Sequence, residues 1–502
     1  MTLSTLKNSH SSSNKSDIIF RYAVLTAAVM LILSFALKTA GQVLYLIFAV
    51  LLLIIGIFIG VLKRNSGLII TVLLIAIFCF RIISVFSFSI NTAYKYDGIR
   101  ENIVAVLVGP PVQRGDIDSA YCIAEVYESE RNLLSRGDRV LLSGDGVINL
   151  SLGDKVTADV KLSALDRKEQ ISFYSENVFL NATLLETAAV DDSDKNVYSL
   201  SFRVREYARK ILTNNTKNSG MLLAILTGER SFIGDNFYEQ VKAAGLSHIL
   251  VVSGMHFTVL CGMVIRLLSM SRLPEFLKDI LLLIFLFIMM CVCGFGMSIL
   301  RASAVYVFAI IYRRLNRLSD SILTLSNAVI LVLFIHPFAA FSLSFLLSFA
   351  STFGILILSS RIMYFIDKRV TLIKPLRYIA EAASVTISAY VATLPIVVYY
   401  FGYVSTYAIL TNILVASVST LMLVLTAIGV IFAGVPMLCN IILTVADYLA
   451  YYFVAVVKLA VKLPLNTIPL RNEWALTVII LLSFAAVYII KAKPYRTLMK
   501  KR

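Results

Sequence analysis

Charged residues are scarce in this 502-residue chain, at 15% of positions against about 25% in an average soluble protein. Hydrophobic residues make up 59%, and the mean hydropathy is +0.84. That much apolar side chain exceeds what one globular core can hold. The composition therefore excludes a soluble enzyme and makes the lipid bilayer the solvent of most of the chain.

Histidine is rarer still, with four residues, and the sequence contains no His-x-x-x-His and no paired-cysteine zinc pattern. The glycine-rich loop of ATP- and GTP-hydrolysing proteins is also absent. Of the six cysteines only Cys122 lies in a polar stretch, so that stretch can form no internal disulfide. We therefore expect neither a metal nor another cofactor, and no nucleotide-driven motor within the chain.

Long apolar runs dominate the sequence, and most approach the roughly 20 residues that cross a bilayer as a helix. They predict a polytopic α-helical membrane protein of about twelve transmembrane helices. The 403–433 run is long enough for either one tilted helix or a re-entrant pair. The runs are 18–37, 42–62, 66–90, 246–268, 277–297, 300–313, 321–336, 340–360, 380–401, 403–433, 436–463 and 473–491.

Between the third and fourth runs the chain is polar and contains short alternating segments such as NIVAVLV, AYCIAEV, DRVLLSG and VTADVKL, separated by glycine-rich turns. This alternation predicts a small β-rich domain, a barrel being one form that it could take. Residues 199–212 follow with the apolar spacing of an amphipathic helix. The predicted domains are a polar tail (1–17), three transmembrane helices (18–90), the β-rich domain (91–198), a helical connector (199–245), a second transmembrane domain (246–491) and a basic tail (492–502).

Lysine and arginine positions predict the orientation, because cytoplasmic loops carry the excess of positive charge. Lys63 and Arg64 follow the second run, and Arg313 and Arg314 lie at the end of the sixth. Both pairs fall inside if the two termini are cytoplasmic and residues 91–198 are extracellular. The β-rich domain holds 18 acidic and 11 basic side chains, whereas the whole chain has a net charge of +16. Much of the positive charge is thus explained by orientation and does not by itself indicate a polyanionic partner.

The most unusual segment is residues 227–260, where polar side chains and glycines lie at the start of an apolar run. If this segment is one helix, its Ser/His pairs recur about two turns apart, near one face. Such a face suits a water-filled path, and it suits equally well the close packing of helices. The residues concerned are Gly245, Ser247, His248, Ser253, Gly254 and His256.

Other polar residues also interrupt the apolar runs. Arg301 lies among small residues, and a cation at membrane depth favours a functional cavity over a structural ion pair. We expect Asp320 to cap a helix. Glu381 and Asp447 could be proton or ion sites, but capping of helix ends fits them at least as well.

Two other functions are compatible with these residues. One is an intramembrane hydrolase with Ser253 as nucleophile and His256 or His248 as base, although residues three apart on one helix seldom meet in attack geometry. The other is a small-solute transporter, for which the hydropathy shows no inverted repeat.

The stretch AGLSHILVVSGMHF resembles the signature of ComEC-type competence proteins, and the similarity extends to LLAILTGERS, SILRASAV, FSLSF, ATLPIVVYYFG and Asn412. Met255 stands where leucine is common in that family. The resemblance implies a channel, rather than an enzyme, that takes up single-stranded DNA during natural transformation. It also implies a bacterial cytoplasmic membrane location and an extracellular domain similar to an oligonucleotide-binding barrel. The positions expected along the DNA path are Gly245, Ser247, His248, Ser253, Gly254, His256, Arg301, Ser344 and Asn412.

The partners implied are single-stranded DNA, a DNA-receptor protein on the outer side and a cytoplasmic ATPase or helicase, within a lipid bilayer. The motor is needed because each phosphate entering a negative interior costs roughly 2.3 kcal/mol per 100 mV. Many family members carry a metallo-β-lactamase-like domain, but no histidine follows His336 in this sequence. We therefore expect a separate nuclease to degrade the second strand. The oligomeric state is left open.

Overall fold

The computed structural model describes two compact units, one of residues 1–203 and 294–345 and the other of residues 204–293 and 346–502. The predicted runs 18–37, 42–62 and 473–491 fall mostly outside the described residues, and both tails fall wholly outside them. The described residues are 25–30, 50, 54, 66–85, 93, 95–109, 111–113, 120–165, 173–186, 189–191, 197–229, 232–250, 254–293, 296–315, 320–369 and 374–470.

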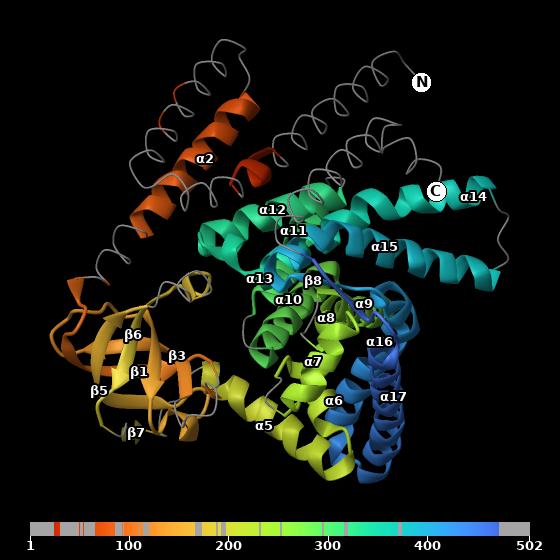
Figure 1. The fold of residues 1–502 in the computed structure, drawn as a ribbon. Coiled ribbons are helices and arrows are strands. Elements are labelled where there is room, and N and C mark those ends of the chain that lie inside the picture. The colour runs from red at the N-terminus through yellow and green to blue at the C-terminus, as the bar shows by residue number, and fades with distance from the viewer. Residues whose placement is uncertain are drawn as a thin grey trace. The chain divides into compact units, whose positions relative to one another are not determined.

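The first unit contains the β-rich domain, which is a closed five-stranded barrel (Figure 1). The closing contact is made by β1, which pairs antiparallel with both β3 and β5. The remaining neighbours are antiparallel except for β4 and β6, which run parallel. The strands are β1 (Arg100–Leu107), β3 (Ala120–Ser129), β4 (Arg139–Gly144), β5 (Lys155–Ala164) and β6 (Val178–Leu184), with the short β2 (Val112–Gln113) and β7 (Ala189–Asp191) added at β3 and β5.

Alternating burial explains why these segments form strands. Along β5 the buried positions from Val156 to Leu162 alternate with exposed ones, as expected for a strand with one face on a core. The four alternating segments read from the sequence all lie in barrel strands, so the predicted barrel is confirmed. A one-turn 3-10 helix, η2 (Val147–Asn149), joins β4 to β5.

Cys122 lies inside this barrel on β3, where its side chain is 1% exposed. Burial disfavours the thiolate and raises the pKa of Cys122 to about 12. The thiolate is the reactive form, so alkylation at pH 8 should be about a thousandfold slower in the folded protein than after unfolding. Mass spectrometry of the Cys122 peptide measures this ratio. Ser135→Cys on an exposed turn of the same barrel is the matched control, and it should react at the unfolded rate in both states.

Helices complete the first unit. They are α2 (Ser66–Val85), α11 (Met297–Arg314), α12 (Ser321–Ile335) and the short η3 (Ala339–Phe341). Asp320 caps α12, with its carboxylate accepting from the Ile322 amide at 2.9 Å, which confirms the predicted cap. The α12 helix ends just before Pro337, as proline requires. Arg81 of α2 donates to the Ile335 carbonyl at 3.3 Å, so the C-terminal ends of α2 and α12 lie together.

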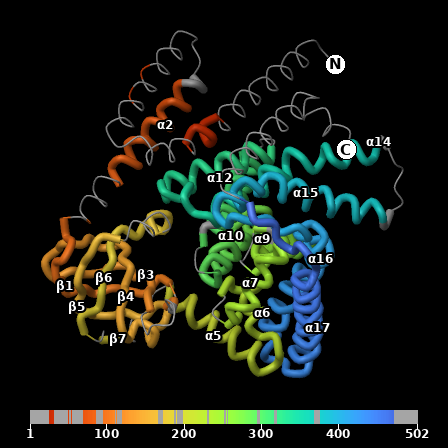
Figure 2. Tube along the Cα trace, in the orientation of Figure 1, coloured from red at the N-terminus to blue at the C-terminus, as the bar shows by residue number. Residues whose placement is uncertain are grey.

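The second unit is helical and is built around a hairpin of two long helices, α16 (Ala408–Ile431) and α17 (Pro436–Lys462), which run side by side (Figures 1 and 2). Gly429 allows their close approach, since a Cβ there would lie 2.5 Å from Leu443 Cδ2. The predicted 403–433 run therefore contains one helix rather than a re-entrant pair. Its first residues form the short strand β8 (Tyr403–Ser405), which pairs with β9 (Thr467–Pro469).

The remaining helices of this unit precede the hairpin in the sequence. Helix α5 begins in the first unit, and α13 also begins there. These helices are α5 (Val197–Asn215), α6 (Ser219–Thr227), α7 (Asp235–Ala243), α8 (Ser247–Leu250), α9 (Gly254–Met270), α10 (Glu275–Val292), α13 (Leu343–Gly354), α14 (Ser360–Arg369) and α15 (Lys374–Phe401). A π-helical turn, Ile355–Ser359, joins α13 to α14.

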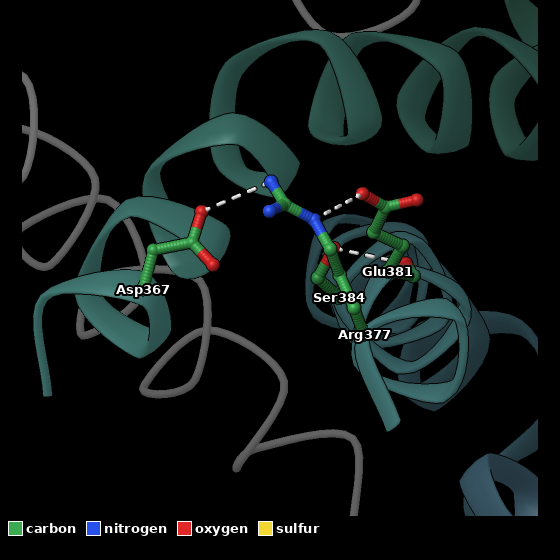
Figure 3. Close-up of polar contacts among 4 residues, drawn as sticks. All are labelled: Asp367, Arg377, Glu381 and Ser384. Atoms are coloured by element: carbon green, nitrogen blue, oxygen red, sulfur yellow. Dashed lines mark hydrogen bonds and ion pairs between the residues drawn. The ribbon is translucent and has the colours of Figure 1, made fainter. Parts of the chain in front are cut away.

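A small ion cluster joins α14 to α15 (Figure 3). The Arg377 guanidinium lies 3.4 Å from Asp367 Oδ2 and 3.3 Å from Glu381 Oε1, and Ser384 Oγ donates to the Glu381 carbonyl at 3.0 Å. The charged side chains of the cluster are close to half exposed, so each ion pair contributes less than about 1 kcal/mol. Glu381 is thus engaged with Arg377 at the surface.

Four helical segments among the described residues are long and apolar enough to cross a bilayer: Leu343–Asp367, Leu376–Phe401, Ala408–Gly434 and Pro436–Lys462. Three shorter apolar helices accompany them, Ile69–Val85, His256–Met270 and Ser321–Ile335. The chain is thus a largely helical membrane protein with a small barrel, whereas the predicted count of twelve transmembrane helices is not confirmed.

Candidate polar site

The signature segment begins at a sharp corner between α7 and α8, and Gly245 forms it. Gly245 has a left-handed φ of +75°, which glycine adopts without steric cost. Its amide donates to the Lys242 carbonyl at 2.9 Å, and the Leu246 amide donates to the Val241 carbonyl at 3.0 Å. These two bonds make a Schellman motif, which ends α7 and satisfies its last carbonyls.

Residues far along the chain hold this corner in place. Ser405 Oγ donates to the Ala243 carbonyl at 2.7 Å, and Thr411 Oγ1 donates to the Ala244 carbonyl at 2.8 Å. A Cβ on Gly245 would lie 2.4 Å from the Cβ of Ala408, at the first turn of α16. Glycine is therefore required here both by the backbone angle and by the contact with α16.

His248 on α8 begins a chain of polar side chains that crosses three helices. Its ring lies near the Asn412 side chain of α16 and the Gly245 backbone, within range of an electrostatic interaction with both. Asn412 Nδ2 in turn donates to Thr386 Oγ1 of α15 at 3.0 Å. Thr386 is 9% exposed, so the α15 end of this chain of polar side chains lies within packed helices.

His256 on α9 lies beside this polar chain. It is fully buried, and it lies near enough to His248 for charges on the two rings to repel each other. Gly254 begins α9, and its carbonyl accepts from Thr258 Oγ1 at 2.7 Å. The structure thus brings Gly245, His248, His256 and Asn412 into one region, with Ser247 at the start of α8.

Ser253 lies between α8 and α9, outside the described residues. The shared face predicted for the two Ser/His pairs assumed one helix from 246 to 268, whereas helix is described only on the two sides of 251–253. Neither that shared face nor the hydrolase that needs Ser253 is tested, and both stay predictions.

Arg301 and Ser344 belong to the first unit and form a separate polar group. Arg301 on α11 is 4% exposed, so its cation is held within packed helices. Ser298 lies one turn earlier on the same face, and its Oγ is 2.9 Å from Ser344 Oγ at the start of α13. Ser344 itself is exposed.

The sequence prediction missed Thr386. Its only signal is a hydroxyl in an apolar helix, which Ser384, Ser388 and Thr393 of the same helix share. Those three donate to carbonyls of their own helix, three or four residues back. Only the position of Asn412 across the interface distinguishes Thr386, and the sequence does not reveal that position.

The described residues contain no group of three histidine, cysteine, aspartate or glutamate side chains that could hold a metal ion. The polar chain of the second unit offers hydrogen-bond donors and acceptors, and the first unit holds the buried guanidinium of Arg301. Such groups can solvate a polar or anionic solute among apolar helices.

Comparison with known proteins links this region to a family. The model of the competence protein family matches residues 225–494, which include the α7–α8 corner and all the residues of the polar chain. The ComE operon protein 3 of Bacillus subtilis (strain 168) is 26% identical over 332 residues, 65% of this chain and 39% of that protein. The chain thus matches well under half of that relative's length. No solved structure matches.

Proposed function

The chain belongs to the competence protein family, and on that premise we propose that it is a membrane channel for the uptake of single-stranded DNA during natural transformation. The observation that carries the proposal is the polar chain of His248, Asn412 and Thr386, with His256 beside it. Polar side chains among apolar helices are costly unless they line a water-filled path or form hydrogen bonds between helices. A nucleic acid strand presents both anionic phosphates and hydrogen-bonding bases to such groups.

Contacts within the first unit support the proposed orientation. The charge pattern predicts that the barrel, the end of α2 and the α12–α13 connection share the outer side. Arg81 of α2 reaches the Ile335 carbonyl at the end of α12, and Asn177 of the barrel contacts His336. All three predicted outer segments are thus joined by side-chain contacts, as an extracellular barrel over the outer ends of these helices requires.

The proposal includes partners. A DNA strand moving toward a negative interior needs a cytoplasmic ATPase or helicase to pull it, because of the cost of each phosphate charge. An outer receptor is needed as well, since a barrel with excess acidic side chains is a poor general collector of DNA. The proposal also includes a nuclease that supplies the single strand.

Uptake of labelled DNA into a nuclease-resistant state tests the assignment of the path. We expect Arg301→Ala and His256→Ala each to lower uptake about tenfold or more, which corresponds to a barrier about 1.4 kcal/mol higher. Thr258→Ser is the matched control, because Thr258 is exposed on the same helix as His256 and serine keeps the hydroxyl bonded to the Gly254 carbonyl, and it should leave uptake unchanged. Normal uptake by both alanine variants at normal protein levels would remove these residues from the path.

A further inference from the structure

One outer face of the barrel is covered instead of facing solvent. On β4 three consecutive residues, Val140, Leu141 and Leu142, are at most 4% exposed. In a strand with one solvated face, alternate residues would be exposed, so β4 is packed on both sides. Leu141 lies in a second apolar cluster outside the barrel core, together with Leu165, Val178, Tyr121, Ile123, Phe173 and Tyr174.

The cover comes from the connection between β5 and β6. The Phe173 ring packs edge-on against Tyr121 of β3, with centroids 5.9 Å apart. Tyr174 packs against Phe179 of β6, with centroids 5.3 Å apart. Arg139 of β4 donates to the Glu176 carbonyl at 3.3 Å, which ties the connection to the barrel wall.

A segment from outside the barrel completes this face. Phe338, in the connection between α12 and α13, is 2% exposed, and its ring centroid lies 6.0 Å from those of both Tyr174 and Phe179. Two residues earlier, His336 Nδ1 lies 2.9 Å from Asn177 Nδ2. One aromatic ring and one hydrogen bond thus attach the helical connection to the barrel.

This face has a known use in barrels of this kind. Oligonucleotide-binding barrels hold their ligand on the second and third strands and on loops that include the one between strands four and five. In this barrel these elements are β3, β4 and the β5–β6 connection. Aromatic side chains on such a face are platforms on which bases stack. Here the platform already carries Phe338.

We propose that this face is a permanent docking surface for the α12–α13 connection, with Phe338 in the position of a stacked base. It follows, if the proposed function holds, that a DNA strand passes the barrel on another surface. The barrel then acts on this side as a rigid attachment to the helices and not as a reader of DNA. Its contacts with Phe338 and His336 persist while DNA is taken up.

Locking the contact tests the proposal. In Asn177→Cys/His336→Cys, a short reducible bifunctional thiol reagent should bridge positions 177 and 336 in resting membranes. The controls are the two variants that carry only one of these substitutions, which retain the same six native cysteines. Uptake after bridging should stay within about twofold of the unbridged double variant. If the barrel and the α12–α13 connection never separate, a bridge between them does not change the populations of docked and undocked protein. Failure to bridge, or a loss of uptake that reduction restores, overturns the proposal.

A second measurement needs no substitution, which matters because Asn177 has a left-handed φ of +61°, which strains a cysteine placed there. Single-stranded DNA carrying 5-iodouracil is photocrosslinked to the unmodified protein during uptake. No adduct should form on Tyr121, Phe173, Tyr174 or Phe179, and an adduct on any of them overturns the proposal. If the unmodified protein takes up no DNA, the proposed function is wrong. The yield of the bridge between positions 177 and 336 still tests whether the α12–α13 connection is docked on the barrel.

Discussion

Replacing Gly245 by alanine should lower the free energy of unfolding by about 3 kcal/mol. A left-handed φ costs a residue with a side chain about 1–2 kcal/mol, and overpacking adds about 1–3 kcal/mol. Both terms apply here, because φ is +75° and the new Cβ would lie 2.4 Å from Ala408 Cβ and 3.0 Å from Ala408 Cα. Unfolding of the purified protein by SDS titration in mixed micelles measures the change.

Gly262→Ala is the matched control for this substitution. Gly262 lies in α9, and a Cβ there meets nothing within 4 Å. Alanine in a helix interior is more favourable than glycine by about 0.5–1 kcal/mol, so this variant should be slightly stabilised. Equal effects of the two substitutions would show that the corner against α16 does not constrain position 245.

Removal of the Asp447 carboxylate should have the second large effect. Asp447 Oδ1 on α17 accepts from the Asn218 amide at 2.8 Å and from Asn218 Nδ2 at 3.0 Å, so it caps the start of α6 from another helix. Hydrogen bonds to a charged group contribute about 1.5–3 kcal/mol each, and a partly buried donor left alone adds a desolvation cost. Asp447→Ala should therefore lower the free energy of unfolding by about 2–4 kcal/mol, measured by the same SDS titration.

Asp367→Ala provides the comparison, because it removes an aspartate whose ion pair is near half exposure. Arg377 keeps Glu381 at 3.3 Å in that variant, so the loss should stay below about 1 kcal/mol. The position of the Asp447 carboxylate at a partly buried helix start, rather than its charge alone, accounts for the difference. An Asp447→Ala variant as stable as Asp367→Ala would contradict the capping role.

Local patterns in the sequence predict those parts of the fold that depend on local interactions. Alternation identifies the segments of β1, β3, β4 and β5, and an acidic residue before an apolar run identifies the Asp320 cap. The closure of the barrel through β1 and β5, and the parallel pairing of β4 with β6, join strands that are far apart in the sequence. No local pattern encodes such pairings.

In the candidate site, too, the sequence predicts local features but not the contacts between distant residues. The signature directs attention to Gly245 and His248, but the reasons for their positions lie about 160 residues further on, at Ser405, Ala408 and Asn412. Asp447 is visible in the sequence as a carboxylate in an apolar run. Only the fold shows that it faces the start of α6 instead of an ion path.

Closure of the barrel also limits how this domain can meet other macromolecules. Because β1 is bonded on both sides, it leaves no open backbone edge along which another extended chain could be added as a further strand. Recognition by strand addition is therefore unavailable at β1. A partner that meets β1 must be recognised through side chains and connecting loops, so exchanges of surface residues there will change its affinity.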